Sequence, residues 1–292
     1  MDDQRLRQLE RAWEGTGDVA AGVAWLAENL RAGEISAEEV RVRAYLGDGL
    51  ARHVLGPERP TRYDALPGFV ERWYSEPLAP DYAAATRRLA ELEAQHGPLS
   101  AALREWIVLT WGRECPFSQD YLLEPRRFPV GAGGHVPLFA ENQGNFSYTS
   151  RLEDQAAEDD PRVWVDGAQQ GVATSSEALM TGLLYETCWN GAEQELFGGG
   201  ALLGWLAEGV SGALGQPRFE ALAGLYSLLG APLAPFGEIL NGPRAEPEEL
   251  RVYGDEDLLI GGFGTLTGEI FAYGIVRDAS RMDELRQALD LD

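Results

Sequence analysis

Apolar residues in the first part of the chain recur at spacings of three and four, which is the period of an amphipathic helix. Leu6, Leu9 and Trp13 form the first such stripe, and Ser36 followed by Glu39 has the spacing of a helix-capping box. Glycine and proline interrupt the pattern, most clearly at residues 56–60. Helices are therefore predicted within residues 1–55 and at 64–76, 82–96 and 100–109.

Beyond Gly112 the apolar residues alternate and are separated by glycine and proline, which is typical of strands and turns. Strands are predicted at residues 120–124, 137–141, 145–149, 162–166, 250–253, 258–263 and 269–276. Helices are predicted after capping residues Ser175 and Ser176, over most of residues 201–229, and at residues 282–289. Asn142–Gln143–Gly144 has the composition of a hairpin turn between two of the strands.

This order, helices followed by strands that are not interleaved one by one with helices, predicts an α+β fold. We expect a mostly antiparallel sheet flanked by helices, with an N-terminal helical segment. The division that follows is a helical region at residues 1–80 and an α+β domain at residues 81–292.

The net charge of the chain limits the classes of partner that it is expected to bind. It has 47 acidic and 24 basic residues, a formal net charge of −23, and no lysine at all. Such a chain repels nucleic acid and anionic membranes, whereas it attracts a basic protein. Two interpretations of the acidity stay open: it keeps the protein in solution, or it recruits a basic partner.

Cysteine and histidine usage gives no sign of a disulfide framework, a metal site or a bound cofactor. Cys115 and Cys188 are expected to be buried thiols, and the polar N-terminus and the absence of a long apolar run predict a cytoplasmic protein. His53, His96 and His135 lack partners at metal-ligand spacing. His135 follows the glycine-rich residues 131–134, which makes it the one histidine considered for catalysis.

Three other motifs are considered and set aside. Ser211 between Gly209 and Gly212 lacks the strand and the second glycine of a nucleophile elbow. The glycines at 262, 264 and 268 are followed by a strand pattern, whereas a dinucleotide fingerprint requires a helix there. The acidic run at residues 153–160 lacks the alternating ligands of a calcium loop, so it is either a solvated loop or a contact surface.

Three stretches resemble the SUKH superfamily: residues 88–106 (RLAELEAQHGPLSAALREW), 137–144 (PLFAENQG) and 159–165 (DDPRVWV). In that superfamily a glutamate-bearing helix runs into a glycine and a second helix. One subgroup then has an acidic–Asn–Gln–Gly turn and an Asp–Asp–Pro before the next strand. The resemblance covers about residues 85–190.

The resemblance implies a non-enzymatic immunity protein that binds and neutralises a cognate bacterial toxin, often a nuclease. Nucleases are often basic because they bind a polyanion, which agrees with the acidity of this chain. The expected contact residues are Glu141, Asn142, Gln143, Glu158, Asp159 and Asp160. Two alternatives stay open: a regulatory or scaffold module without a toxin partner, and a hydrolase that uses His135 with a nearby carboxylate.

Overall fold

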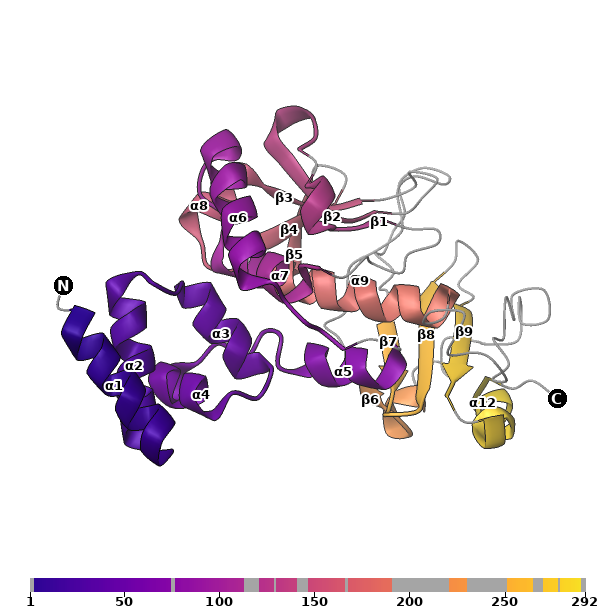
Figure 1. The fold of residues 1–292 in the computed structure, drawn as a ribbon. Coiled ribbons are helices and arrows are strands. Elements are labelled where there is room, and N and C mark those ends of the chain that lie inside the picture. Colours follow the sequence, from indigo (N-terminus) through magenta and orange to yellow (C-terminus); the bar gives the residue numbers. More distant parts are fainter. Residues whose placement is uncertain are drawn as a thin grey trace.

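The computed structural model describes residues 3–74, 77–112, 121–128, 130–140, 147–165, 168–190, 221–229, 251–264, 270–277 and 279–289. A helical N-terminal part leads into two antiparallel sheets with accompanying helices (Figure 1). The predicted α+β class is confirmed, and every strand pair among the described residues is antiparallel.

The N-terminal half is helical where the apolar period predicted it. The helices are α1 (Asp3–Thr16), α2 (Val19–Ala32), α3 (Ala37–Tyr45), α4 (Gly49–Leu55), α5 (Ala65–Trp73), α6 (Tyr82–His96) and α7 (Ala101–Thr110). Side-chain caps explain several of their starts. The hydroxyl of Ser36 accepts from the backbone N–H of Glu39 at 3.0 Å, and Ser100 does the same for Leu103 at 3.3 Å.

The first sheet has five strands in the order β1-β2-β3-β4-β5. They are β1 (Tyr121–Leu122), β2 (His135–Ala140), β3 (Ser147–Arg151), β4 (Arg162–Val165) and β5 (Ala168–Thr174). The short helix α8 (Leu152–Ala157) links β3 to β4, and α9 (Ser175–Asn190) follows β5. The sequence pattern predicted neither α8 nor β5, because α8 is short and acidic and β5 lacks a clear alternation of apolar residues.

The second sheet has four strands in the order β6-β7-β8-β9. They are β6 (Ser227–Leu228), β7 (Arg251–Gly254), β8 (Leu258–Gly264) and β9 (Ile270–Val276), and α12 (Met282–Leu289) follows. The prediction of a mostly helical block at residues 201–229 is wrong at β6, which pairs with β7. Residues 201–220 of that block lie outside the described part of the chain.

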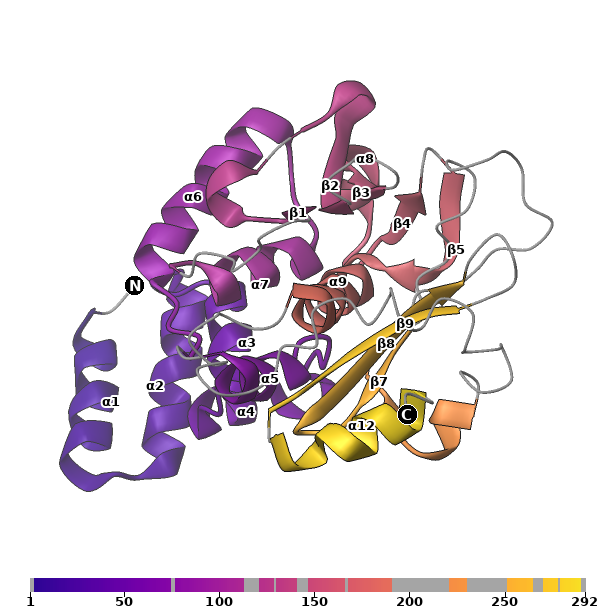
Figure 2. The ribbon, with the colours of Figure 1, turned by 90° about the vertical axis from the view of Figure 1, so that its right-hand side faces the viewer.

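Helix α9 joins the two sheets into one core. Figure 2, which looks nearly along α9, shows it between the five-stranded sheet and β7–β9, and it contacts strands of both. The Tyr185 ring on α9 meets Phe139 of β2 with ring centroids 5.5 Å apart. A Cβ atom at Gly182 would lie 3.0 Å from the Phe139 ring, a tight contact that glycine avoids where α9 approaches β2.

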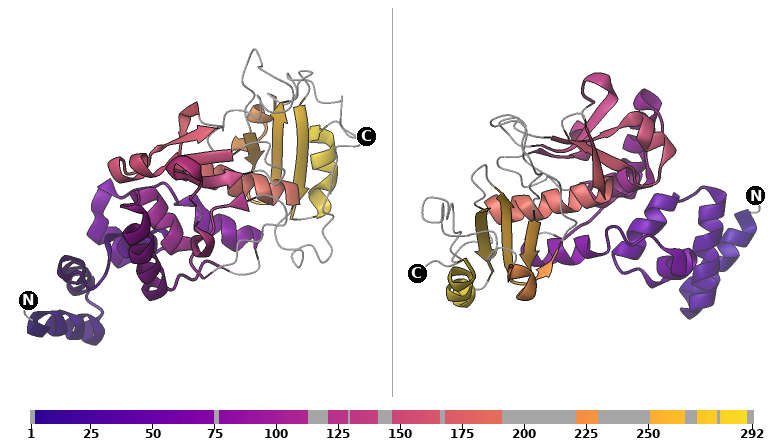
Figure 3. Two further views of the ribbon diagram at one scale, coloured as in Figure 1. Left: turned by 90° about the horizontal axis from the view of Figure 1, so that it is seen from above. Right: turned by 180° about the vertical axis from the view of Figure 1, so that it is seen from behind.

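The main apolar core also extends into the helical region. Tyr45, Tyr63 and Leu66 belong to the same buried cluster as Leu103 on α7 and Leu259 on β8. The core is therefore continuous across residue 80, the predicted boundary between the two regions. A smaller cluster of Leu26, Val40, Ala44 and Ala51 packs α2, α3 and α4 together, and Figure 3 shows α1 and α2 at the end of the molecule opposite α12.

Within the described residues, no helix combines the length and the apolar character that are needed to cross a bilayer.

Candidate functional site

Three of the six predicted contact residues fall in the turn between α8 and β4. Glu158, Asp159 and Asp160 occupy this turn, whereas Glu141, Asn142 and Gln143 lie outside the described residues. We call residues 158–160 the acidic turn. Two backbone hydrogen bonds hold it: the Glu158 N–H donates to the carbonyl of Asp154 at 3.0 Å, and the Asp159 carbonyl accepts from the N–H of Ala102 at 2.9 Å.

Asp160 directs its carboxylate into the protein. Its Oδ1 accepts from the backbone N–H of Ser176 at 3.0 Å, and its Oδ2 accepts from the Ser176 hydroxyl at 2.5 Å and from the Thr174 hydroxyl at 3.1 Å. The Arg62 guanidinium lies 3.8 Å away. Asp160 therefore supports the first turn of α9, where the helix dipole favours a negative charge.

The start of α9 differs from the prediction that Ser175 and Ser176 cap it. Thr174 and Glu177 form a reciprocal pair: the Thr174 N–H donates to the Glu177 carboxylate at 2.8 Å, and the Glu177 N–H donates to the Thr174 hydroxyl at 3.4 Å. Ser175 instead donates its hydroxyl to the carbonyl of Pro161 at 2.9 Å. The prediction was one residue late because Thr174 also ends strand β5.

Glu158 and Asp159 present their carboxylates to solvent. Both side chains are exposed, and neither forms an ion pair with another described residue. Glu153 on α8 adds a third exposed carboxylate, although it lies 3.4 Å from the guanidinium of Arg151. The acidic turn thus combines a fixed backbone with charges that the described part of the chain does not neutralise.

An aromatic and basic cluster lies beside the acidic turn, on one face of the five-stranded sheet. The guanidinium carbon of Arg151 stands 3.2 Å from the centre of the Trp164 ring. The Trp164 indole N–H donates to the Asp154 carboxylate at 2.9 Å, and the His135 ring meets Trp164 edge-on at 6.4 Å. These side chains are half-buried. We call Arg151, Asp154 and Trp164 the tryptophan cluster.

The opposite face of that sheet is core. Val136, Leu138, Tyr148 and Val163 are fully buried. Trp164 lies on β4, next to β3, and its Cα partner there is Thr149, whereas Tyr148 pairs with Val165. Successive residues of a strand point to opposite faces, so Tyr148 belongs to the core and Trp164 to the other face.

His135 forms its hydrogen bond with a hydroxyl group. Its Nδ1 lies 3.1 Å from the Thr149 hydroxyl, which itself donates to the carbonyl of Trp164 at 3.3 Å. Among the described residues, no hydrogen bond or ion pair joins His135 to a carboxylate. No group of three or more acidic, histidine or cysteine side chains in the described ranges is arranged to hold a metal ion.

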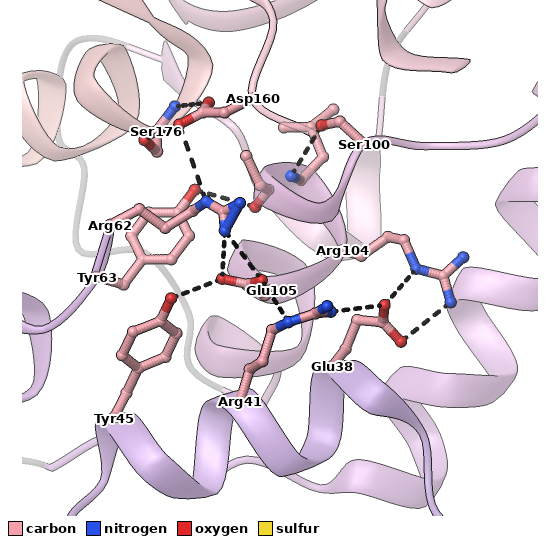
Figure 4. Close-up of polar contacts among 12 residues, drawn as sticks. Glu38, Arg41, Tyr45, Arg62, Tyr63, Ser100, Arg104, Glu105, Asp160 and Ser176 are labelled. Carbon is pink, nitrogen blue, oxygen red and sulfur yellow. Dashed lines mark hydrogen bonds and ion pairs between the residues drawn. The ribbon is translucent and has the colours of Figure 1, made fainter. Parts of the chain in front are cut away.

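A buried ionic network connects the acidic turn to the helical region (Figure 4). At its centre the Glu105 carboxylate, on α7, is inaccessible to solvent. It accepts from the Tyr45 hydroxyl at 2.7 Å and from Arg62 at 3.2 Å, and Arg41 lies 3.5 Å away. Arg62 also faces Asp160, so one guanidinium bridges α7 and the acidic turn.

Burial and ion pairing compete in setting the pKa values of this network. Burial raises the pKa of Glu105 above its ordinary value, although Arg62, Tyr45 and Arg41 oppose the shift. Burial also acts to raise the pKa of Glu38, but bonds from Arg104 outweigh it and lower that pKa. The sequence did not indicate this network, because its members lie on separate elements and carry no common motif.

The two cysteines were predicted to be buried thiols. Cys188 on α9 is buried, which confirms that prediction for it, and burial raises the pKa of its thiol. Cys115 lies outside the described residues.

Comparison with known proteins gives no match to a protein-family model, to a curated protein or to a solved structure. The resemblance to the SUKH superfamily therefore rests on the sequence motifs alone.

Proposed function

We propose that this chain is a non-enzymatic binding protein of the immunity type, which neutralises a basic protein toxin. The observation that carries the proposal is the acidic turn, where Glu158 and Asp159 project from a backbone that is hydrogen-bonded to α7 and to α8. A surface that is already ordered loses little conformational entropy on binding. The same turn contains the Asp–Asp–Pro motif that resembles the SUKH superfamily.

The tryptophan cluster supplies the other half of the proposed contact surface. Tryptophan and arginine are enriched among the residues that dominate binding energy at protein interfaces. Trp164 and Arg151 hold each other by stacking, and Asp154 fixes the indole ring. In this proposal the carboxylates attract the basic partner, and the tryptophan cluster contributes the short-range contact.

Asp160 is assigned a positioning role in this proposal, whereas the sequence predicted it as a contact residue. Its carboxylate is engaged by Ser176 and Thr174, so in the proposal it positions the acidic turn and does not contact the partner. The partner-facing residues are then Glu158 and Asp159, to which the Glu141–Gln143 segment is added from the resemblance.

The test compares two double variants of equal net charge as bait in a native cell lysate. The first is Glu158→Arg with Asp159→Arg, and the control is Glu14→Arg with Glu34→Arg on exposed positions of the helical region. Wild type and control should capture the same basic protein at low salt and lose it at high salt. The acidic-turn variant should not capture it.

A captured protein is then purified and its association with each variant is measured. Loss of electrostatic steering should slow association by about tenfold or more for the acidic-turn variant alone. The captured protein should also be toxic when expressed alone and harmless when the wild-type chain is co-expressed. Equal association rates for the two variants would remove the acidic turn from the interface. Capture of several non-basic, non-toxic proteins would favour the scaffold alternative.

A further inference from the structure

A cavity of about 730 Å³ is lined by residues of α5, of α9 and of the four-stranded sheet. Figure 1 shows α5 and β7–β9 well apart from α8, the helix that precedes the acidic turn. Its floor is apolar and consists of Phe69 and Trp73 from α5, Met180 and Leu184 from α9, and Leu229 after β6. Trp73 and Leu184 are each only 2% exposed. The volume and the apolar lining are those of sites that hold small organic molecules.

The guanidinium groups at the cavity each face a carboxylate. Arg72 lies 2.8 Å from Asp257, and Arg277 lies 4.0 Å from the same carboxylate. Arg72 also donates to the backbone carbonyl of Glu256 at 3.2 Å. Both arginines therefore already lie beside carboxylates of the chain itself.

At the rim of the cavity, carboxylates outnumber guanidinium groups. Asp255 is bound by Arg281 at 2.7 Å, but Glu71 has no ion pair with any residue that the structure describes. The Glu256 side chain is 84% exposed and lies 3.3 Å from an arginine that already has a closer partner. The mouth of the cavity therefore carries uncompensated negative charge, which favours a cation.

Gly68 keeps one wall of the cavity open. It lies within helix α5, where glycine is less favourable than alanine. Its φ angle is not positive, and a Cβ atom added to it would meet no other atom within 4 Å. Neither backbone conformation nor packing requires glycine here, whereas a larger side chain would project into the cavity. Glycine at position 68 therefore weakens helix α5 and leaves the space beside it unfilled.

We propose that this cavity is a binding site for a small aromatic cation, with the aromatic group on the Phe69–Trp73 floor and the cationic group beside Glu71. The rings of Phe69 and Trp73 stack with centroids 6.4 Å apart, and Phe69 is the more exposed ring of the two. This site is separate from the proposed protein contact and does not depend on it.

The test uses two probes with the same apolar group and opposite charges, 4-phenylbutylamine and 4-phenylbutyrate, added to the full chain. Binding is followed by isothermal titration calorimetry and by ligand-observed saturation-transfer NMR. For probes of this size we expect a dissociation constant on the order of 1 mM for the amine, and about tenfold weaker binding of the carboxylate.

Three variants locate the site. Gly68→Leu fills the wall and should abolish amine binding, whereas Gly15→Leu, at an open helical glycine on α1, should leave it unchanged. Glu71→Gln, at an exposed position, should weaken amine binding by about two- to fivefold and should not weaken carboxylate binding, because it removes a negative charge that attracts the amine and repels the carboxylate. Circular dichroism verifies that each variant is folded.

Several outcomes would overturn the proposal. They are failure of the wild-type chain to bind the amine, preference for the carboxylate, equal binding by Gly68→Leu and wild type, and an unchanged amine affinity in Glu71→Gln. Because Glu71→Gln tests the charge without altering the packing, the proposal stays testable even if Gly68→Leu does not fold.

Discussion

Arg62 and Glu105 are 43 positions apart in the sequence, yet Nη1 of Arg62 lies 3.2 Å from Oε1 and 3.4 Å from Oε2 of Glu105. Arg62 belongs to the segment between α4 and α5, and Glu105 lies on α7 with no solvent exposure. This pair anchors the connecting segment to the core. Since Arg62 also faces Asp160, the same contact reaches the acidic turn.

Removing the Glu105 carboxylate should strongly destabilise the protein. Glu105→Ala leaves Arg62, Arg41 and the Tyr45 hydroxyl without their buried acceptor, and breaking a buried ionic group in this way costs about 3–5 kcal/mol of unfolding free energy. Urea unfolding followed by circular dichroism measures the loss. The control is Glu91→Ala, which removes a surface pair with Arg88 and should change stability by less than about 1 kcal/mol. Similar losses for the two variants would contradict the structural role of the network.

The salt bridges of Arg281 should make part of the stability dependent on pH. Bonds from Arg281 lower the pKa of Asp255 and of Glu284 below their ordinary values. The unfolded chain therefore binds these protons more readily, so the stabilisation is present above the ordinary pKa values and is lost as the pH falls through the lowered ones. Because the groups are partly exposed, Arg281→Met should cost about 1 kcal/mol at neutral pH, and the difference from wild type should close in acid.

Urea unfolding of both proteins across this pH range measures the effect. Arg286→Met, an exposed change on the adjoining helix α12, is the matched control and should follow wild type at every pH. A constant difference between Arg281→Met and wild type down to acid pH would show that the effect is not electrostatic.

Adjacent aspartates of the acidic turn should respond differently to alanine. Asp160→Ala removes the acceptor for Ser176 and Thr174 at the start of α9, and loss of a helix cap costs about 0.5–2 kcal/mol. Asp159→Ala removes an exposed carboxylate whose contact with α7 is made by the backbone, so it should change stability by less than about 0.5 kcal/mol. Thermal and urea unfolding of the two variants measure the difference in their unfolding free energies. Equal stability of the two would place the Asp160 carboxylate outside the cap.

Enlarging Gly182 should disrupt the contact of α9 with the five-stranded sheet. A Cβ atom there would lie 3.0 Å from Phe139 and 3.1 Å from Leu122, so Gly182→Val overpacks the core and should cost about 1–3 kcal/mol. The same substitution at Gly68, where a Cβ atom meets open space, should change stability by less than about 1 kcal/mol. Comparison of the two unfolding free energies separates crowding from the effect of valine on a helix. Equal costs at the two glycines would contradict the close approach at Gly182.

Local patterns in the sequence predicted most of the helices and strands. The bounds of α6 and α12 agree with their predictions, since apolar spacing, capping residues and helix-breaking residues act over a few neighbouring positions. The same reasoning missed β5 and placed the cap of α9 at Ser175 and Ser176 instead of Thr174. β5 is defined by its pairing with β4, and Thr174 both ends β5 and caps α9. Neither feature can be recognised from neighbouring residues alone.

Composition and short-range periodicity were enough to predict most of the helices and strands, the α+β class and the excess of negative charge. Only the tertiary structure decided that Glu158 and Asp159 face solvent while Asp160 faces α9, that Glu105 is buried against Arg62, and that a cavity opens beside Gly68. These properties depend on which distant segments meet. Hydrophobic burial drives such contacts without regard to sequence separation, so periodicity along the chain cannot show which carboxylate ends up inside.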